Sequence, residues 1–442
     1  MIKTGRKFFR QAKNNKAHFV FKERRIMNRT NNAEMEFTLN HLPASDDRWL
    51  SVMDVENVRK ALTFHRSFPQ YEVTPLHSLK QMAKYLGVKG LYVKDESYRF
   101  GLNAFKVLGG SYAIGSYIAK KTGKDISELP YEVLSSEQFR EEMGQTTFYT
   151  ATDGNHGRGV AWAANRLGQK AVVRMPRGSA KTRRDNIAKE GAEVTIEDLN
   201  YDECVRLAAS QAKTDPSGVI VQDTAWRGYT DIPSWIMQGY GTMALEADRQ
   251  LLADGVERPT HIFVQAGVGS LASAVVGYFA NKYKDEEPVM CVCEAGAAAC
   301  LYRSAVKGTG ETVKVRGKLD TIMAGLACGE PNVIGWDILR NHAAGFAACP
   351  DWMSAKGTRM YGVPLHGDPT VISGESGSVT MGFLASIMMY PRYEEVKKAL
   401  KLDGNSQILL ISTEGNTDPM RFREVVWDGL YGVRHRGEEV VK

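Results

Sequence analysis

One lysine in the chain stands in a setting that favours chemistry at its amine. Lys106 lies in the segment Asn-Ala-Phe-Lys-Val-Leu-Gly-Gly, with apolar residues on both sides and with Gly109 and Gly110 after it. An ammonium group near apolar neighbours loses hydration and gives up its proton more easily, and a Schiff base with an aldehyde requires a neutral amine. A helical lysine is more often a solvated surface charge, but the paired glycines indicate a close backbone contact.

A second candidate is the loop from Thr150 to Gly159, which reads Thr-Ala-Thr-Asp-Gly-Asn-His-Gly-Arg-Gly. It falls between an expected strand and an expected amphipathic helix, so backbone N–H groups and the positive end of the helix are available to a carboxylate or a phosphate. Asp153 and Asn155 are also ordinary cap and turn residue types, and a lone histidine such as His156 more often has a structural role.

A third candidate, Gln265 to Ala272, directly follows the expected strand 261–264 and reads Gln-Ala-Gly-Val-Gly-Ser-Leu-Ala. Its glycines let the backbone approach an anion while the next helix points its positive end at that anion, which predicts phosphate binding. The pattern also satisfies GxGxxA with Glu294 after a later strand, as in a nicotinamide dinucleotide site. Against that alternative, the loop lies past the middle of the chain, and Glu294 is farther from the glycines than the usual about 20 residues.

The elements that must position these segments alternate between helix and strand from Asp46 onward, which predicts an α/β protein with a mostly parallel sheet and helices on both faces. No internal repeat and no linker rich in Pro or Ser divides the chain, so two lobes within one chain are expected. The expected strands are 91–93, 146–151, 170–175, 219–222, 262–265 and 408–412, and the expected helices are 105–119, 158–167 and 181–190.

The composition and the charge pattern narrow the class of protein. The 442 residues are 43% hydrophobic and 24% charged, which excludes a disordered or fibrous chain. The net charge of +6 arises in residues 1–30, which hold ten Lys and Arg and one Glu, so the remainder is mildly acidic and no nucleic acid is expected to bind it. We interpret residues 1–45 as a basic extension without stable structure. Met27 and Met35 are alternative starts, and a mitochondrial presequence is a less favoured interpretation.

Six cysteines are too few for a disulfide framework, so a reducing compartment, the cytoplasm, is expected. Cys291 and Cys293 lie within an apolar run that is expected to form a strand, and no metal is predicted. Free thiols are favoured, with a Cys300–Cys328 redox pair as the alternative. The uncharged run Pro259–Asn281 is long enough to cross a bilayer, but its glycines and polar residues divide it into strand, turn and helix, so no membrane association is expected.

Together, the three segments and a terminal Ser-Thr strand resemble the fold type II pyridoxal phosphate enzymes, the family of tryptophan synthase β and threonine dehydratase. Within this family the chain most resembles the diaminopropionate ammonia-lyases, and the resemblance runs from about residue 46 to the C-terminus. The matching stretches are Lys94 to Gly110, Thr152 to Ala164, Gln222 to Trp226, Trp235 to Tyr240, Ile322 to Asn332, Ser373 to Gly377 and Ile411 to Gly415.

The resemblance implies a role for each residue that it matches. Lys106 is the lysine that forms a Schiff base with pyridoxal 5'-phosphate, and Asn155 contacts the ring oxygen of this cofactor. Ser412 or its neighbour Thr413 is the hydroxyl partner of the pyridine nitrogen, which makes the ring a weaker electron sink than a carboxylate partner would and leaves β-elimination accessible. The phosphate loop consists of Gly267, Val268, Gly269, Ser270 and Leu271.

Asp153 departs from the generic family, which has a small hydroxyl residue at this position, but agrees with the ammonia-lyases. A substrate with a β-amino group explains this acid, and Asp223 in the Gln-Asp-Thr-Ala-Trp segment is a second one. The resemblance therefore implies α,β-elimination of D- or L-2,3-diaminopropionate to pyruvate and two ammonia, with Lys106, Asp153 and Asp223 as catalytic residues. The substrate-binding residues are Thr152, Asp153, His156 and Asp223.

In the implied reaction the substrate displaces Lys106 from the cofactor, Lys106 or Asp153 takes the Cα proton, and the β-amino group leaves as ammonia. A serine or threonine dehydratase is the nearest alternative; an NAD-binding α/β protein and a non-catalytic binding protein are more distant ones. The family usually forms homodimers. Residues 46–118 and 238–442 are expected to form a large domain, and residues 119–237 a small one.

Overall fold

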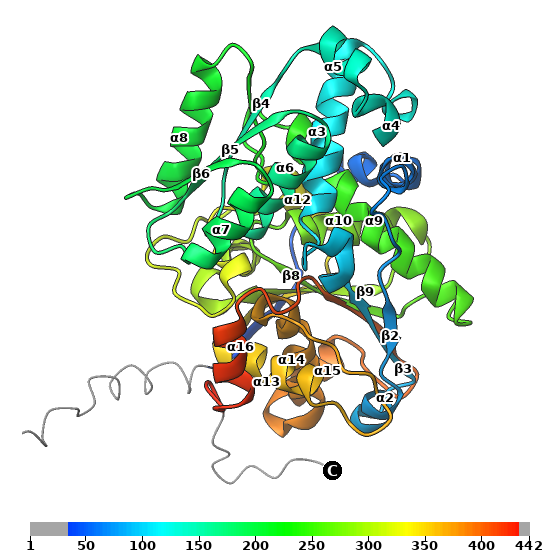
Figure 1. Cartoon of the computed structure of the whole chain (residues 1–442). Coiled ribbons are helices and arrows are strands. Elements are labelled where there is room, and N and C mark those ends of the chain that lie inside the picture. The colour runs from blue at the N-terminus through cyan, green and yellow to red at the C-terminus, as the bar shows by residue number, and fades with distance from the viewer. Residues whose placement is uncertain (1–33, 433–442) are drawn as a thin grey trace, which may run out of the picture.

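The computed structural model describes residues 34–432 and shows an α/β protein built on two sheets (Figure 1). The larger sheet has the strand order β1-β10-β9-β8-β11-β3-β2, and the smaller has the order β6-β5-β4-β7. The strands are β1 (Glu36–Leu39), β2 (Leu76–Ser78), β3 (Gly90–Asp95), β4 (Thr147–Ala151), β5 (Lys170–Met175), β6 (Glu193–Ile196), β7 (Gly218–Ile220), β8 (His261–Ala266), β9 (Val289–Ala295), β10 (Gly345–Cys349) and β11 (Gln407–Ser412).

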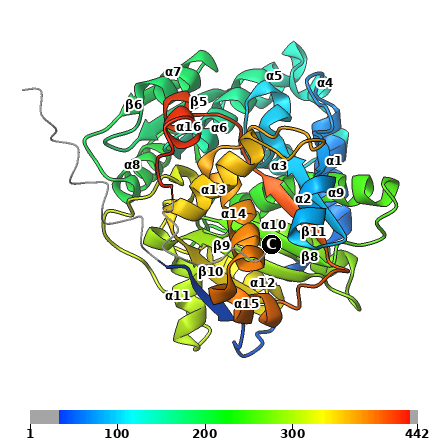
Figure 2. The ribbon, with the colours of Figure 1, turned by 90° about the horizontal axis from the view of Figure 1, so that it is seen from below.

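Helices cover both sheets and fill the region between them (Figure 2). They are α1 (Val55–Arg66), α2 (Lys80–Leu86), α3 (Val107–Thr122), α4 (Tyr131–Leu134), α5 (Glu137–Met143), α6 (Asn155–Arg166), α7 (Lys181–Lys189), α8 (Tyr201–Thr214), α9 (Asp231–Ala253), α10 (Ser270–Lys282), α11 (Cys300–Lys307), α12 (Val333–His342), α13 (Asp351–Gly362), α14 (Glu375–Met389), α15 (Glu394–Ala399) and α16 (Pro419–Val426).

The strands of the two sheets pair mainly in parallel, as is usual for strands that helices cover on both faces. The five central strands of the larger sheet and all four strands of the smaller sheet pair in parallel, whereas the edge strands β1 and β2 are antiparallel. Every residue of β8 is buried, as is typical of a parallel strand between two helix layers. The sequence-based prediction of an α/β fold with a mostly parallel sheet is confirmed.

The helices α3 and α6 pack closely enough to join the two sheets into one body. A Cβ at Gly110 would lie 3.1 Å from the backbone nitrogen of Val160, and one at Gly159 would lie 2.8 Å from that of Val107. A Cβ at Gly109 would meet the ring of Tyr240 at 2.6 Å. The close contact expected of Gly109 and Gly110 is therefore confirmed, and it fixes the start of α3, where Lys106 lies, against α6.

The prediction that residues 1–45 lack stable structure is wrong for residues 36–39. Residues 36–39 form β1, which pairs with residues 345–348 of β10 because the larger sheet has an open edge there. Residues 1–33 lie outside the described residues. The division into 46–118 with 238–442 and 119–237 stays a prediction: the smaller sheet lies between 147 and 220, but α3 and α9 run across both expected boundaries.

The uncharged run 259–281 forms β8, a glycine turn and most of α10, as the sequence predicted. Within residues 34–432, none of the helices combines the length and the apolar character that crossing a bilayer requires.

Candidate active site

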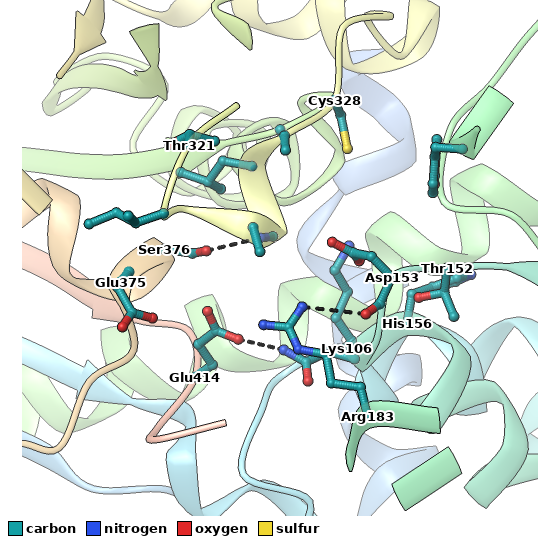
Figure 3. A pocket seen from close by; sticks show the side chains of 18 of the residues that line it. Lys106, Thr152, Asp153, His156, Arg183, Thr321, Cys328, Glu375, Ser376 and Glu414 are labelled. Carbon is teal, nitrogen blue, oxygen red and sulfur yellow. Dashed lines mark hydrogen bonds between the residues drawn. The ribbon is translucent and has the colours of Figure 1, made fainter. Parts of the chain in front are cut away.

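A cavity of about 500 Å³ opens beyond the carboxyl ends of the parallel strands, where α/β proteins commonly bind ligands. The loops after β4, β7, β8 and β11 reach it from both sheets, and Lys106 enters it from the start of α3 (Figure 3). The residues predicted from the sequence that line this cavity are Lys106, Thr152, Asp153, Asn155, His156, Asp223, Gly267, Val268, Gly269, Ser270, Leu271 and Thr413.

Lys106 and Asp223 form a partly buried ion pair in the cavity, in which Nζ donates to Oδ2. Burial by itself would lower the pKa of Lys106, but the negative charge of Asp223 outweighs it and raises this pKa above its ordinary value. Burial likewise opposes ionisation of Asp223, yet the positive charge and the hydrogen bond of Lys106 hold its pKa at about 2. The expectation that apolar neighbours make Lys106 easy to deprotonate is therefore wrong, because the sequence does not show that a carboxylate faces it.

Asp153 differs from Asp223 in the direction of its pKa shift. Desolvation raises the pKa of Asp153, and the positive charges of Arg183 and Lys106 offset only part of that effect. Arg183, on α7, donates from Nη1 to the backbone oxygen of Asp153 at 3.3 Å, and its side chain projects into the cavity beside this loop (Figure 3). The two acids near Lys106 thus have pKa values shifted in opposite directions, an arrangement suited to acid and base roles.

Thr152 and His156 form hydrogen bonds that hold the 152–156 loop in place. The hydroxyl of Thr152 accepts a hydrogen bond from the backbone nitrogen of Gly154 at 3.0 Å. His156 is buried, and its Nε2 donates to the carbonyl of Val221 at 2.9 Å, so this nitrogen carries the proton. Burial lowers the pKa of His156, and its Nδ1 lies 4.0 Å from Oδ2 of Asp223 without a hydrogen bond. We conclude that His156 is a neutral neighbour of the ion pair.

The glycine loop after β8 forms a tight turn that ends at the first residue of α10. Gly269 has φ of +102°, which glycine tolerates, and a Cβ at Gly267 would lie 3.2 Å from the carbonyl oxygen of Gly325. The Ser270 hydroxyl donates to the backbone oxygen of Asp223 and accepts from Nδ2 of Asn332 at 2.8 Å. No role was predicted for Asn332 from the sequence, although this residue ends the stretch 322–332 that resembles the ammonia-lyases.

Of the two hydroxyl residues at the end of β11, Ser412 is the last residue of the strand and does not line the cavity, whereas the next residue, Thr413, does. Nε2 of Gln265 donates to the carbonyl of Ile411 at 3.0 Å and to Oγ1 of Thr413 at 2.8 Å. A carbonyl oxygen only accepts, so the amide nitrogen must face it, and the Thr413 hydroxyl must accept from the same nitrogen. Its own proton is then available to an acceptor in the cavity. Gln265 is the first residue of the glycine-rich candidate segment 265–272, but no role was predicted for it from the sequence.

Glu294, the acid of the alternative dinucleotide pattern, is used elsewhere in the fold. It is buried, and its two carboxyl oxygens accept from the backbone nitrogens of Leu301 at 2.8 Å and Tyr302 at 2.6 Å, at the start of α11. A ribose hydroxyl would have to compete with both bonds, so the structure disfavours the nicotinamide interpretation.

The cysteines show no disulfide, and all six are free. Cys300 Sγ lies 3.7 Å from the carbonyl oxygen of Cys328. In the part of the chain that the structure describes, no group of three or more His, Cys, Asp or Glu could hold a metal ion.

Known proteins resemble this chain both in sequence and in fold. A family profile described as pyridoxal-phosphate dependent enzyme matches residues 68–384. The chain belongs to this family. A diaminopropionate ammonia-lyase of Salmonella typhimurium is 49% identical over 381 residues, which are 86% of this chain and 94% of that protein. The crystal structure of diaminopropionate ammonia-lyase from Escherichia coli in complex with D-serine is 44% identical, has a TM-score of 0.83, and matches 91% of this chain and 99% of its own.

A further structure of the Escherichia coli enzyme, in complex with an aminoacrylate-PLP azomethine reaction intermediate, is also 44% identical, with a TM-score of 0.82 over 92% of this chain and 100% of its own. These similarities confirm the sequence-based prediction of a fold type II, pyridoxal-phosphate-dependent ammonia-lyase.

The cavity fits the cofactor that the family uses. The glycine turn leaves little space for a Cβ at Gly267 and ends at a helix N-terminus, which suits a phosphate site. Lys106 offers an amine for an aldehyde, and Thr413 offers a free hydroxyl proton, which a pyridine nitrogen can accept. The amine, the glycine turn and the hydroxyl therefore match the aldehyde, the phosphate and the ring nitrogen of pyridoxal phosphate, respectively.

Proposed function

We propose that this enzyme catalyses the α,β-elimination of D- or L-2,3-diaminopropionate, giving pyruvate and two molecules of ammonia. The observation that carries the proposal is the pair of carboxyl groups near Lys106, one ionised and one with a raised pKa. The β-amino group must be protonated to leave as ammonia, and the Cα proton needs a base, so a substrate bound with a neutral β-amino group requires both an acid and a base. The similarity to diaminopropionate ammonia-lyases over most of the chain supports the same reaction.

Pyridoxal phosphate, when bound, withdraws electrons from Cα of an amino acid and so makes the Cα proton acidic. We infer that Lys106, Asn155, Thr413 and the loop Gly267, Val268, Gly269, Ser270 and Leu271 hold it. A hydroxyl donor such as Thr413 leaves the ring nitrogen unprotonated, which limits electron withdrawal and favours elimination over transamination.

The acid and base roles follow from the charges around the cavity. Lys106 or an aspartate accepts the Cα proton, and the two hands of the substrate present that proton to opposite sides. Asp153, whose pKa is raised, carries a proton to the leaving β-nitrogen. Asp223 stays ionised and steadies the ammonium form of Lys106 between proton transfers. Thr152 and His156 complete the substrate side of the cavity.

A dehydratase acting on serine is the second candidate, because the Escherichia coli relative has a crystal structure in complex with D-serine. Hydroxide would then replace ammonia as the leaving group. Purified enzyme should be supplied with D- and L-diaminopropionate, D- and L-serine and threonine, and pyruvate or 2-oxobutyrate and ammonia measured. Two ammonia per pyruvate from diaminopropionate, at a kcat/KM well above that for serine, is expected. A preference for serine or threonine would overturn the proposal.

We also propose that the enzyme acts as a homodimer in the cytoplasm. The family tendency supports the dimer, and six free cysteines suit a reducing compartment. Sedimentation of the purified enzyme tests the first point, and fractionation of the cells that make it tests the second.

A further inference from the structure

Glu414 is a buried carboxyl group that the proposed reaction leaves without a role. It follows β11 of the larger sheet by two residues, is 7% exposed, and projects toward the middle of the cavity (Figure 3). Its Oε2 accepts a hydrogen bond from Nδ2 of Asn155 at 2.5 Å and another from the hydroxyl of Thr417 at 3.3 Å. Asn155 begins α6, which packs on the smaller sheet, so this bond joins the two sheets across the cavity.

The backbone around Glu414 is bonded to the segment that presents Lys106. The backbone nitrogen of Phe105 donates to the carbonyl of Thr413 at 3.1 Å, and that of Gly415 donates to the carbonyl of Asn103 at 3.1 Å. Ala104 and Glu414 thereby form an antiparallel bridge. The lysine, the Thr413 hydroxyl and the Glu414 carboxyl are consequently presented by one hydrogen-bonded unit of backbone.

The direction of the Asn155 amide follows from its partner. Oε2 of Glu414 accepts the hydrogen bond and the amide nitrogen of Asn155 donates it, so the amide nitrogen faces Glu414. An amide nitrogen has two protons, and only one of them is used in this bond. The second points away from Glu414 and is available to an acceptor in the cavity that Asn155 lines.

We propose that Glu414 is a positioning residue that fixes the amide of Asn155, so that its remaining N–H faces the ring oxygen of the cofactor. The proposal rests on the inferred contact between Asn155 and that oxygen. Residues that orient a ligating group commonly matter for affinity although they do not touch the ligand, because they reduce the freedom of the group that does.

The test uses purified holoenzyme without substrate, so it gives the same answer whichever amino acid the enzyme consumes. Wild type, Glu414→Ala, Glu414→Gln, Asn155→Ala and the Asn155→Ala/Glu414→Ala double variant are dialysed against graded pyridoxal phosphate. Bound cofactor and the wavelength of its visible absorbance band are recorded. Glu414→Ala should weaken cofactor binding about tenfold and shift the band, because one hydrogen bond to a charged group is lost. Glu414→Gln, which keeps an acceptor oxygen, should restore most of both.

The double variant separates positioning from other effects. If Glu414 acts through Asn155, adding Glu414→Ala to Asn155→Ala should change cofactor affinity by less than about twofold. A tenfold further loss in that background, or an unchanged affinity and band in Glu414→Ala alone, would overturn the proposal. Glu414→Gln is also the charge control, because it removes the carboxylate but keeps an acceptor oxygen for Asn155. If Glu414→Gln weakens cofactor binding as much as Glu414→Ala does, the effect is one of charge and the proposal is overturned.

Discussion

The ammonium group of Lys106 donates to the carboxylate of Asp223, a residue 117 positions later in the chain. This pairing raises the pKa of Lys106 and lowers the pKa of Asp223, whereas burial alone would lower the first and raise the second. Lys106 is held as an ammonium, whereas attack on an aldehyde requires the neutral amine. Asp223 therefore controls how easily Lys106 reacts, in addition to any contact that it makes with substrate.

Asp223→Asn should shift the pH dependence of cofactor attachment. Without the carboxylate, burial becomes the main influence on Lys106 and lowers its pKa, so the neutral amine becomes available at lower pH. The rate at which the visible absorbance band returns on adding pyridoxal phosphate, measured from pH 6 to pH 9, should rise at a lower pH than in wild type. Turnover of diaminopropionate should fall by roughly 10²-fold or more, as expected on loss of a charged catalytic group.

Asp231→Asn provides the matched control, because Asp231 pairs with Lys120 on the surface at 2.5 Å and both side chains are largely exposed. Its profile should overlay that of wild type. If the Asp223→Asn profile also overlays it, the ion pair does not govern the reactivity of Lys106.

Asp153→Asn should harm the diamino substrate more than serine. Asn cannot carry a proton to the leaving β-nitrogen, whereas Asp153 has a raised pKa that suits this role. We expect kcat/KM for diaminopropionate to fall by roughly 10²-fold and that for serine by roughly tenfold or less. Both values should be measured on one preparation, with circular dichroism to verify folding. Equal losses on the two substrates would remove Asp153 from recognition of the β-amino group.

Thr413→Ala and Ser412→Ala form a matched pair on adjacent residues. Thr413 directs a hydroxyl proton into the cavity, whereas the Ser412 hydroxyl is buried without a hydrogen bond and outside the cavity lining. Thr413→Ala should therefore shift the visible absorbance band and lower turnover by roughly tenfold, the effect of one hydrogen bond. Ser412→Ala should leave the absorbance band unchanged. A shift caused by Ser412→Ala, with none from Thr413→Ala, would exchange the two assignments.

Sequence patterns identified two of the loops that line the cavity, because both loops follow buried strands and contain glycines. The Gly267–Gly269 turn and the 152–156 loop were recognisable since only small residues permit such turns, and both lie at strand ends. The close packing at Gly110 was recognisable for the same steric reason.

Pairings between distant segments could not be derived in this way. The sequence shows apolar neighbours around Lys106, but the dominant influence on its pKa is a carboxylate that only the fold brings near. The role of Gln265 likewise depends on β11 lying beside β8. β1 was missed because its few residues show little apolar periodicity, and it is ordered through edge pairing with β10.

His342 joins the segment before α1 to the loop before β9, and this contact should make stability depend on pH. Its ring nitrogens lie 2.9 Å from Oδ2 of Asp47 and 3.0 Å from Oε1 of Glu287. Burial would lower the pKa of His342, but hydrogen bonds to the two carboxyl groups raise it from 6.5 to about 9. Because the folded pKa is raised, the stabilisation is fully present below pH 6.5 and is lost as the pH rises through about 9.

His342→Gln should therefore lower the free energy of unfolding by about 1–2 kcal/mol at pH 6, after allowance for partial solvent screening, and by much less at pH 10. Urea unfolding at both pH values measures this difference, provided that each transition is two-state. His366→Gln, at an exposed histidine after α13, should show no change at either pH. If His342→Gln costs the same at pH 6 and at pH 10, the charge on His342 does not contribute to stability and the contact acts through packing alone.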